Sequence, residues 1–183
     1  KKFLSLFFVL SCILLTLKYH YRYNVERKFH EFNNTNFNQS ISATLLSKKF
    51  KGLQWITPEV ISIDQNNDNI YFLNNVKKIL KNDKKNKIVI TNYSFFSVLL
   101  NENVSAYSRW FPGDNSAFPR KGNIYFNDYK KFIDKILKNK NIENIYVLPD
   151  VSENQLLDYI EISCFSRNDI QFNIVKFSFK DKC

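Results

Sequence analysis

Polar side chains follow two apolar runs of the sequence that have the character of buried strands. The first run is Ile88–Ile90 and the second covers residues 142–148. Asp150 follows the second run, and three polar residues follow the first: Thr91, Asn92 and Tyr93. In open parallel sheets, ligands bind beyond the carboxyl ends of the strands. These side chains are therefore candidates for binding a polar ligand, and we assign no catalytic residue to this segment.

The long irregular stretch from residue 101 to 122 adds aromatic and charged groups to these candidates. Its side chains suited to sugars or phosphates are Tyr107, Ser108, Arg109, Trp110 and Asp114. The alternative is that Trp110 and Pro112 pin the loop against the core, with Arg109 solvated or salt-bridged, because Trp and Arg serve both purposes. We carry Arg109, Trp110 and Asp114 forward as ligand-binding candidates beside the strand-end residues.

Several enzyme classes are excluded because their sequence signatures are missing. The chain contains no phosphate-binding GxxxxGK[ST] or GxGxxG loop, no GxSxG elbow and no HExxH motif. His20 and His30, the two histidines, lie beside the apolar amino-terminal run. Residues 64–75 match only the start of an EF-hand loop, because Asn69 and Asn75 stand where Gly and Glu are required. We expect neither a metal nor a cofactor in this segment.

The elements that must position these groups read as one α/β domain. Helical spacing of apolar residues predicts helices at 70–80 and 125–137, and Ser152 with Gln155 predicts a capping box for a third helix. Strands are expected at four places: 52–58, 88–90, 142–148 and 170–179, the last with a β-bulge near Val175. This order implies a small, mostly parallel, three-layer sheet domain, Rossmann-like but without a Gly-rich loop.

An uncharged apolar run, Phe3–Leu17, opens the chain. With its basic and tyrosine flanks it reaches about 20 residues, the usual length of a membrane span. An uncleaved signal-like anchor and a buried core helix are the alternatives. We predict a transmembrane helix with its flanks at 1–23, a polar Asn-rich stalk at 24–50 that could hold a short helix near 41–46, and a soluble α/β domain at 51–183.

The net charge of +10 raises the question of an anionic partner. The lysines fall on polar helix faces and the aromatic residues on apolar ones, so a solvated surface over an aromatic core explains both. We therefore do not expect nucleic acid as a partner, and the lipid bilayer is the expected one. The same positive charge would also attract the protein to anionic lipid headgroups, which asks less of the surface than binding nucleic acid does.

Cys164 and Cys183 are the two cysteines outside the apolar run. They follow the last predicted helix and the last predicted strand, so an antiparallel return could bring them together. A bridge would add about 3 kcal/mol and require an oxidising compartment. Two free thiols in a cytoplasmic domain fit the spacing equally well, and the basic residues Lys18 and Arg22 after the span favour a cytoplasmic carboxyl side.

Five strings of the sequence together resemble a known class of membrane enzyme. They are YRYNVERKFH at 21–30, GLQWITP at 52–58, VITNYSF at 89–95, SRW at 108–110 and the terminal Cys183. The chain resembles the carboxyl region of bacterial polytopic GT-C glycosyltransferases, related to dolichyl-phosphate-mannose–protein mannosyltransferases. The opening Lys1-Lys2 without Met likewise favours an internal piece of a longer protein.

The resemblance implies a function and a compartment. Such enzymes transfer a sugar from a polyprenyl-phosphate donor with an acidic residue of an early extracytoplasmic loop, which would lie upstream of this segment. It implies an inner-membrane protein whose carboxyl domain lies in the periplasm, where a Cys164–Cys183 bridge is favoured, and whose partner is a polyprenyl-phosphate sugar or a glycan acceptor. The alternatives are a single-span membrane-anchored binding or assembly module without catalytic activity and, third, a lipid- or nucleic-acid-binding domain in the cytoplasm.

Overall fold

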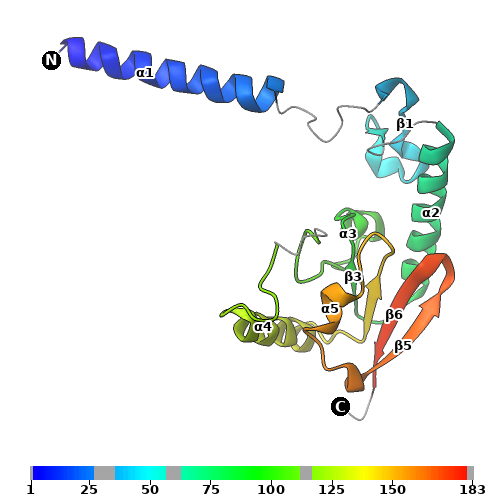
Figure 1. Cartoon of the computed structure of the whole chain (residues 1–183). Helices are drawn as coiled ribbons and strands as arrows, with labels where there is room; N and C mark the ends of the chain where they lie inside the picture. The colour runs from blue at the N-terminus through cyan, green and yellow to red at the C-terminus, as the bar shows by residue number, and fades with distance from the viewer. Residues whose placement is uncertain (1, 27–35, 57–62, 112–116, 181–183) are drawn as a thin grey trace. The chain divides into compact units, whose positions relative to one another are not determined.

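The structure, a computed structural model, describes residues 2–26, 36–56, 63–111 and 117–180 (Figure 1). It shows a mixed α/β chain with an amino-terminal apolar helix and two small sheets. The chain divides into two compact units, Lys1–Ile70 and Tyr71–Cys183, and each is described by itself. The boundary lies inside helix α2 (Ile63–Asn82), so the first turns of this helix belong to the amino-terminal unit.

Helix α1 (Lys2–Tyr21) is apolar along its length and exposes apolar side chains on every side. It continues as a π-helical turn, Arg22–Glu26, where the rings of Tyr19 and Tyr23 stack with centroids 6.1 Å apart. The segment Phe3–Val25 has a mean hydropathy of 1.8 and is long and apolar enough to cross a membrane, with none of it buried. A helix that is apolar on all faces requires apolar surroundings. This is the helix that the sequence predicts as a membrane span.

Residues 36–56 form a small folded segment of 3-10 turns and a two-stranded antiparallel sheet. In chain order its elements are η3 (Phe37–Gln39), β1 (Ile41–Ser42), η4 (Ala43–Leu45), η5 (Lys48–Phe50) and β2 (Gln54–Trp55). A polar residue precedes each turn, and its side chain accepts a hydrogen bond from a backbone N–H within the turn: Asn36, Ser42 and Ser47. The helix expected near 41–46 is thus a short strand followed by a 3-10 turn.

The second unit is built around a four-stranded sheet. After α2 its elements are β3 (Lys87–Ile90), α3 (Phe96–Leu100), α4 (Phe126–Asn139), β4 (Asn144–Val147), α5 (Asn154–Leu157), η6 (Ile162–Cys164), β5 (Phe165–Ile170), η7 (Gln171–Asn173) and β6 (Ile174–Phe179). The strand order is β3-β4-β6-β5, with β3–β4 parallel and the other two pairings antiparallel. The sheet is therefore mixed, and the mostly parallel, three-layer Rossmann-like sheet expected from the sequence is not confirmed.

Two local features account for this difference. The strand expected at 52–58 is β2, which pairs with the nearby β1 and contributes nothing to the main sheet. The phase change expected as a bulge near Val175 is instead a tight hairpin, in which Ile170 pairs with Ile174. Phe172 and Asn173 adopt left-handed backbone angles, with φ of 63° and 55°, and reverse the chain within three residues. The last alternating segment is therefore two antiparallel strands.

The parallel strands β3 and β4 lie in the centre of the hydrophobic core, and every residue of both is buried. Strands buried on both faces read as continuous apolar runs, as these two do over most of their length. One face contributes Ile88, Ile90, Ile145 and Val147 to a cluster with side chains of α4, α5 and the long loop. Helix α2 lies on the other side of the sheet (Figure 1). It buries Leu73, Val76 and Leu80.

Helix α5 departs from its prediction. It begins at Asn154, after Glu153 at the N-cap, with no side-chain hydrogen bond at the cap, so the capping box of Ser152 and Gln155 is wrong. The backbone N–H of Gln155 instead donates to the carbonyl of Ser152 at 2.9 Å, while the Gln155 side chain is buried. The helix ends at Leu157 because Tyr159 and Ile160 turn into the core.

Both edges of the main sheet are occupied by local contacts. At the β3 edge, Val89 N–H donates to the carbonyl of Val104 at 3.0 Å and a single bridge joins Val89 to Ser105. At the β5 edge the side chains between Phe165 and Ile170 are polar, and Arg167 forms ion pairs with Glu153 and Asp169 at 2.9 and 2.8 Å.

Candidate functional site

The parallel pairing of β3 and β4 brings Thr91, Asn92 and Asp150 together at the carboxyl ends of these strands. The Thr91 hydroxyl donates to the Asp150 carboxylate, 2.9 Å from Oδ1 and 3.0 Å from Oδ2. The backbone N–H of Asn92 donates to Asp150 Oδ2 at 2.6 Å. Tyr93 N–H donates back to Thr91 Oγ1 at 3.0 Å, so the hydroxyl is used as donor and as acceptor. Thr91 is buried, and this group is therefore a rigid polar node rather than a free nucleophile.

The carboxylate of Asp150 is only partly compensated at this node. Burial of the carboxylate raises the pKa of Asp150 above its ordinary value, and the hydrogen bonds from Asn92 and Thr91 offset this only in part. Among the described residues, no ion pair reaches Asp150. The carboxylate is thus held in place by neutral donors.

Asn92 also connects the node to the long loop. Its side-chain oxygen accepts a hydrogen bond from the backbone N–H of Phe111 at 2.9 Å, and its side-chain N–H donates to the carbonyl of Asp150 at 3.5 Å. Tyr93 is half-buried, with its ring 5.6 Å from that of Phe95. One asparagine side chain therefore fixes the distance between the strand ends and the loop.

The structure places the ligand-binding candidates of the long loop in different surroundings. Arg109 is exposed and borders a small cavity of about 40 Å³ that Thr91 and Tyr93 also line. Trp110 is 61% exposed, and its backbone bonds to the hydroxyl of Ser108. Asp114 and Pro112 lie outside the described residues. Trp110 does not pack into the core, so the alternative in which this side chain pins the loop is wrong.

Three other aromatic residues of the loop pin it to the core. Tyr107, Phe111 and Phe118 are buried and pack edge-to-face on one another with centroids 5.5–5.8 Å apart. The Tyr107 hydroxyl donates to the Gln155 carbonyl of α5 at 2.5 Å, and burial raises its pKa well above the ordinary value. Burial also raises the pKa of Tyr129, on α4, to about 12.

A larger polar cavity of about 610 Å³ opens beside the node. Sequence reasoning missed most of its lining, which combines basic, acidic and amide side chains: Asn92, Arg120, Lys121, Asp150, Asn154 and Asp158. The guanidinium of Arg120 lies over the Phe118 ring, 4.6 Å from its centroid, which attaches this side chain to the aromatic cluster. The cavity therefore joins the strand ends, the loop and α5.

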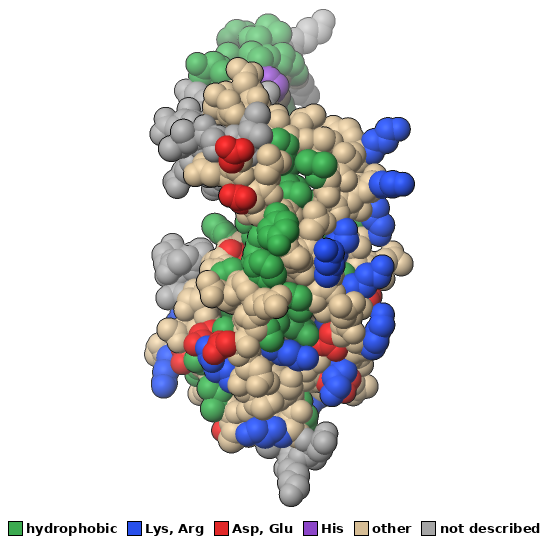
Figure 2. Space-filling view, turned by 90° about the vertical axis from the view of Figure 1, so that its right-hand side faces the viewer, with side chains coloured by type: hydrophobic (Ala, Val, Ile, Leu, Met, Phe, Trp, Pro, Cys, Tyr) green, Lys and Arg blue, Asp and Glu red, His purple; other side chains and the backbone are tan. Residues whose placement is uncertain are grey.

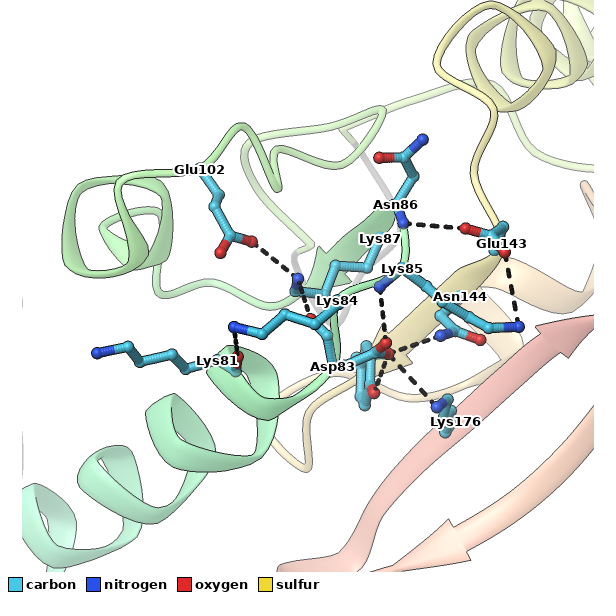
Figure 3. A network of polar contacts seen from close by, with 11 residues as sticks. Lys81, Asp83, Lys84, Lys85, Asn86, Lys87, Glu102, Glu143, Asn144 and Lys176 are labelled. Atoms are coloured by element: carbon cyan, nitrogen blue, oxygen red, sulfur yellow. Dashed lines mark hydrogen bonds and ion pairs between the residues drawn. The ribbon is translucent and has the colours of Figure 1, made fainter.

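The opposite, amino-terminal edge of the same strands carries a second polar network (Figure 3). Asp83 Oδ2 accepts hydrogen bonds from Asn144 Nδ2 and the Tyr146 hydroxyl, both at 2.6 Å, and lies 3.4 Å from Lys176 Nζ. Burial alone would raise the pKa of Asp83, but the hydrogen bonds from Tyr146 and the Lys85 N–H, with the charge of Lys176, bring it below the ordinary value. Asp83 thus connects the end of α2 to β4 and β6.

A buried lysine extends this network. The side chain of Lys87 is 3% exposed, and its ammonium donates to the Asp83 carbonyl and to Glu102, both at 2.8 Å. Glu143 accepts from the Asn86 N–H at 3.3 Å and pairs with Lys85 at 3.5 Å. Sequence reasoning treated these lysines as a solvated face, which does not hold for Lys87.

The cysteines divide into two kinds. Cys164 is disulfide-bonded, whereas Cys12 in α1 is a free, exposed thiol. Cys183 lies outside the described residues, so the Cys164–Cys183 pairing stays a prediction.

The described residues offer hydrogen bonding rather than covalent chemistry at the carboxyl-end edge. In that part of the chain no three or more His, Cys, Asp and Glu side chains gather as a metal site. Comparison with known proteins matches no protein-family model, no curated protein and no solved structure.

Proposed function

We propose that this chain is the last membrane span and the extracytoplasmic carboxyl-terminal domain of a bacterial membrane glycosyltransferase-like protein that uses a polyprenyl-phosphate sugar donor. The observation that carries the proposal is α1, whose apolar side chains are exposed along its whole length, in a chain that also contains a separate α/β unit. An exposed helix of this composition is stable in lipid and not in water. In this proposal the sugar transfer itself is carried out upstream of Lys1.

The disulfide bond at Cys164 supports the periplasmic side of the inner membrane as the location of the domain. Disulfides persist in the bacterial periplasm and are rare in the cytoplasm. In this proposal the disulfide is stronger evidence for the compartment than the basic residues that follow α1, which favour a cytoplasmic carboxyl side.

The polar edge formed by β3 and β4 supports a binding role for the domain. This pair is the one parallel pairing of the described sheet, and its carboxyl ends border the cavity beside Asp150. The lipid bilayer and a polyprenyl-phosphate sugar or glycan acceptor are the proposed partners, and nucleic acid is not. On the face shown in Figure 2, lysine and arginine side chains line the right-hand edge, and acidic side chains lie among them in the lower part of the face.

The second candidate is a single-span membrane-anchored binding or assembly module without catalytic activity. The Thr91–Asn92–Asp150 node favours it, because its groups are saturated by mutual hydrogen bonds and hold a surface rather than activate a nucleophile. The two candidates share the anchor and the compartment, and they differ in what precedes α1.

The coding sequence upstream of Lys1 and the compartment of the domain test the proposal. We expect several further apolar spans and an acidic residue in an early extracytoplasmic loop, and we expect membranes with the full protein to transfer labelled sugar from a polyprenyl-phosphate donor. A start codon directly before Lys1 would leave only the second candidate. Alkaline phosphatase fused after Cys183 should be active and a fluorescent protein fused there dark, whereas the reverse pattern places the domain in the cytoplasm and contradicts both candidates.

A further inference from the structure

The cavity beside Asp150 has walls from three separate elements that hold one another in place. Asn92 comes from the end of β3, Lys121 from the loop, and Asn154 and Asp158 from α5 and its end. Asn92 fixes the loop through the Phe111 N–H, and Tyr107 fixes it to α5 through the Gln155 carbonyl. These two hydrogen bonds connect the strand end, the loop and α5, the three elements that line the cavity. The cavity volume of about 610 Å³ is within the range of small-molecule sites.

The lining is mainly polar and balanced in charge, and Phe111 and Val151 add apolar groups to it. Arg120 and Lys121 contribute two positive groups, and Asp150 and Asp158 contribute two negative ones. Asn92 and Asn154 add amide groups, each of which can donate and accept hydrogen bonds. Asn154 and Asp158 are four residues apart around α5, so they lie on the same side of the helix.

This balance selects among ligand classes. A phosphate or another anion would gain from the two cations but would meet the repulsion of two carboxylates in the same cavity. A neutral polyhydroxylated ring has hydroxyls that donate to carboxylates and accept from ammonium and amide groups, so it can bond to both the acidic and the basic side chains of the lining. A lipid tail would leave these polar groups without partners.

We propose that this cavity binds a neutral sugar unit of a glycan. The inference rests on the proposed function in taking the domain to be a partner-binding part of a glycosyltransferase-like protein. It assigns to the domain the uncharged glycan acceptor and leaves the polyprenyl-phosphate donor to the membrane portion.

A printed array of neutral, phosphorylated and uronic-acid oligosaccharides, probed with the full-length protein in lipid nanodiscs, tests this inference. The wild type should bind neutral glycans, and 10 mM inorganic phosphate, about tenfold above an ordinary millimolar-affinity site, should not compete. Asn154→Ala and Lys121→Ala should each weaken binding about fivefold, the effect of one lost hydrogen bond. The matched controls Asn139→Ala and Lys135→Ala, exposed on α4 outside the cavity, should bind like the wild type.

A separate variant tests whether the acidic side chains of the cavity disfavour anionic ligands. Asp158→Asn removes one of the two carboxylates and should increase binding of phosphorylated glycans relative to neutral ones. Binding of phosphorylated glycans alone by the wild type, no glycan binding by the folded protein, or equal binding by the cavity variants and their controls would each overturn the inference. If sugar transfer and periplasmic topology hold while neutral glycans do not bind, only this inference fails. If neutral glycans bind but the domain is cytoplasmic, the proposed function fails.

Discussion

Asp83 and Asp150 lie at opposite ends of the β3–β4 pair, and they differ in their charged neighbours and in how strongly burial acts on the carboxylate. Asp83 has a cation, Lys176, in addition to two short hydrogen bonds from buried side chains, and its pKa is lowered. Asp150 is bound by the Thr91 hydroxyl and the Asn92 N–H, and its pKa is raised. Both carboxylates are well hydrogen-bonded, so the number of bonds alone does not separate them.

This difference indicates that the Asp83 carboxylate stabilises the fold, whereas the Asp150 carboxylate borders a cavity that can bind a ligand. Asp83 joins elements far apart in sequence, since Asn144 and Tyr146 lie 61 and 63 residues away. Asp150 faces a cavity with a mixed polar lining. The amino-terminal edge is therefore expected to dominate stability, and the carboxyl-terminal edge to dominate binding.

Removal of the Asp83 carboxylate is the strongest way to test this comparison. Asp83→Ala leaves the Tyr146 hydroxyl and the Asn144 amide without their acceptor, at about 1–3 kcal/mol for each buried group, so we expect a loss of about 4 kcal/mol. Denaturant unfolding of the full chain in detergent would measure it. Asp128→Ala, which removes an exposed pair with Lys131, is the control and should cost about 0.5 kcal/mol or less. Equal losses in the two variants would contradict the structural role of Asp83.

The Lys87–Glu102 pair gives the next largest effect. Glu102→Ala leaves a buried ammonium with only the Asp83 carbonyl, and we expect a loss of about 2 kcal/mol. The double variant Lys87→Met with Glu102→Ala removes the buried charge as well and should recover part of that loss. If the double variant is less stable than Glu102→Ala by the full cost of a second substitution, the two groups are not coupled.

The opposite pKa shifts of the two aspartates predict opposite pH dependences. The lowered pKa of Asp83 gives stability that is present above the ordinary value of 3.8 and is lost as the pH falls through the folded-state pKa. The raised pKa of Asp150 gives stability that is present below 3.8 and is lost as the pH rises through its folded-state pKa. As the pH rises from about 2.5 to 6, the free-energy cost of Asp83→Asn should therefore grow and that of Asp150→Asn should shrink. Unfolding curves measured across this pH range test the prediction. The same pH dependence of the free-energy cost for both variants would refute it.

Trp110 is expected to give the smallest effect on stability. Its side chain is 61% exposed on the loop at the carboxyl-terminal edge, so Trp110→Ala should change the free energy of unfolding by about 0.5 kcal/mol or less. Phe111→Ala, one residue further and 3% exposed, should cost about 3 kcal/mol and is the matched comparison. Sugar transfer by the complete protein would show whether Trp110 contributes to function, and unchanged activity would remove it from the candidates.

Local patterns in the sequence predict the elements whose apolar residues repeat regularly. The helix expected at 125–137 is α4, the run at 88–90 lies within β3, and the run at 142–148 contains β4. Their parallel pairing also follows from the sequence, and it places Thr91 and Asn92 beside Asp150. Helix α2 begins at Ile63, earlier than expected, because its first turns are rich in Asn and Asp and lack an apolar repeat.

What the sequence did not predict depends on contacts between distant residues or on single backbone angles. The hairpin at Phe172 requires left-handed angles that Phe rarely adopts, so the alternation reads as one strand with a bulge. The Asp83 contacts and the cavity residues Arg120 and Asn154 come from segments with no shared local pattern. The packing around Tyr107 decides whether Trp110 or Phe111 turns inward, and the spacing of residues in the sequence does not predict that packing.

The charged outer strand β5 bears on how copies of this domain would meet if α1 anchors them in one membrane, as proposed. Domains tethered in this way diffuse in two dimensions and meet one another often, and an open strand edge would let two copies join their sheets into a growing assembly. Arg167, paired with Glu153 and Asp169, places charge along that edge, and the Val89–Ser105 bridge covers part of the other. Both edges of the sheet therefore carry features that oppose the joining of sheets between neighbouring copies.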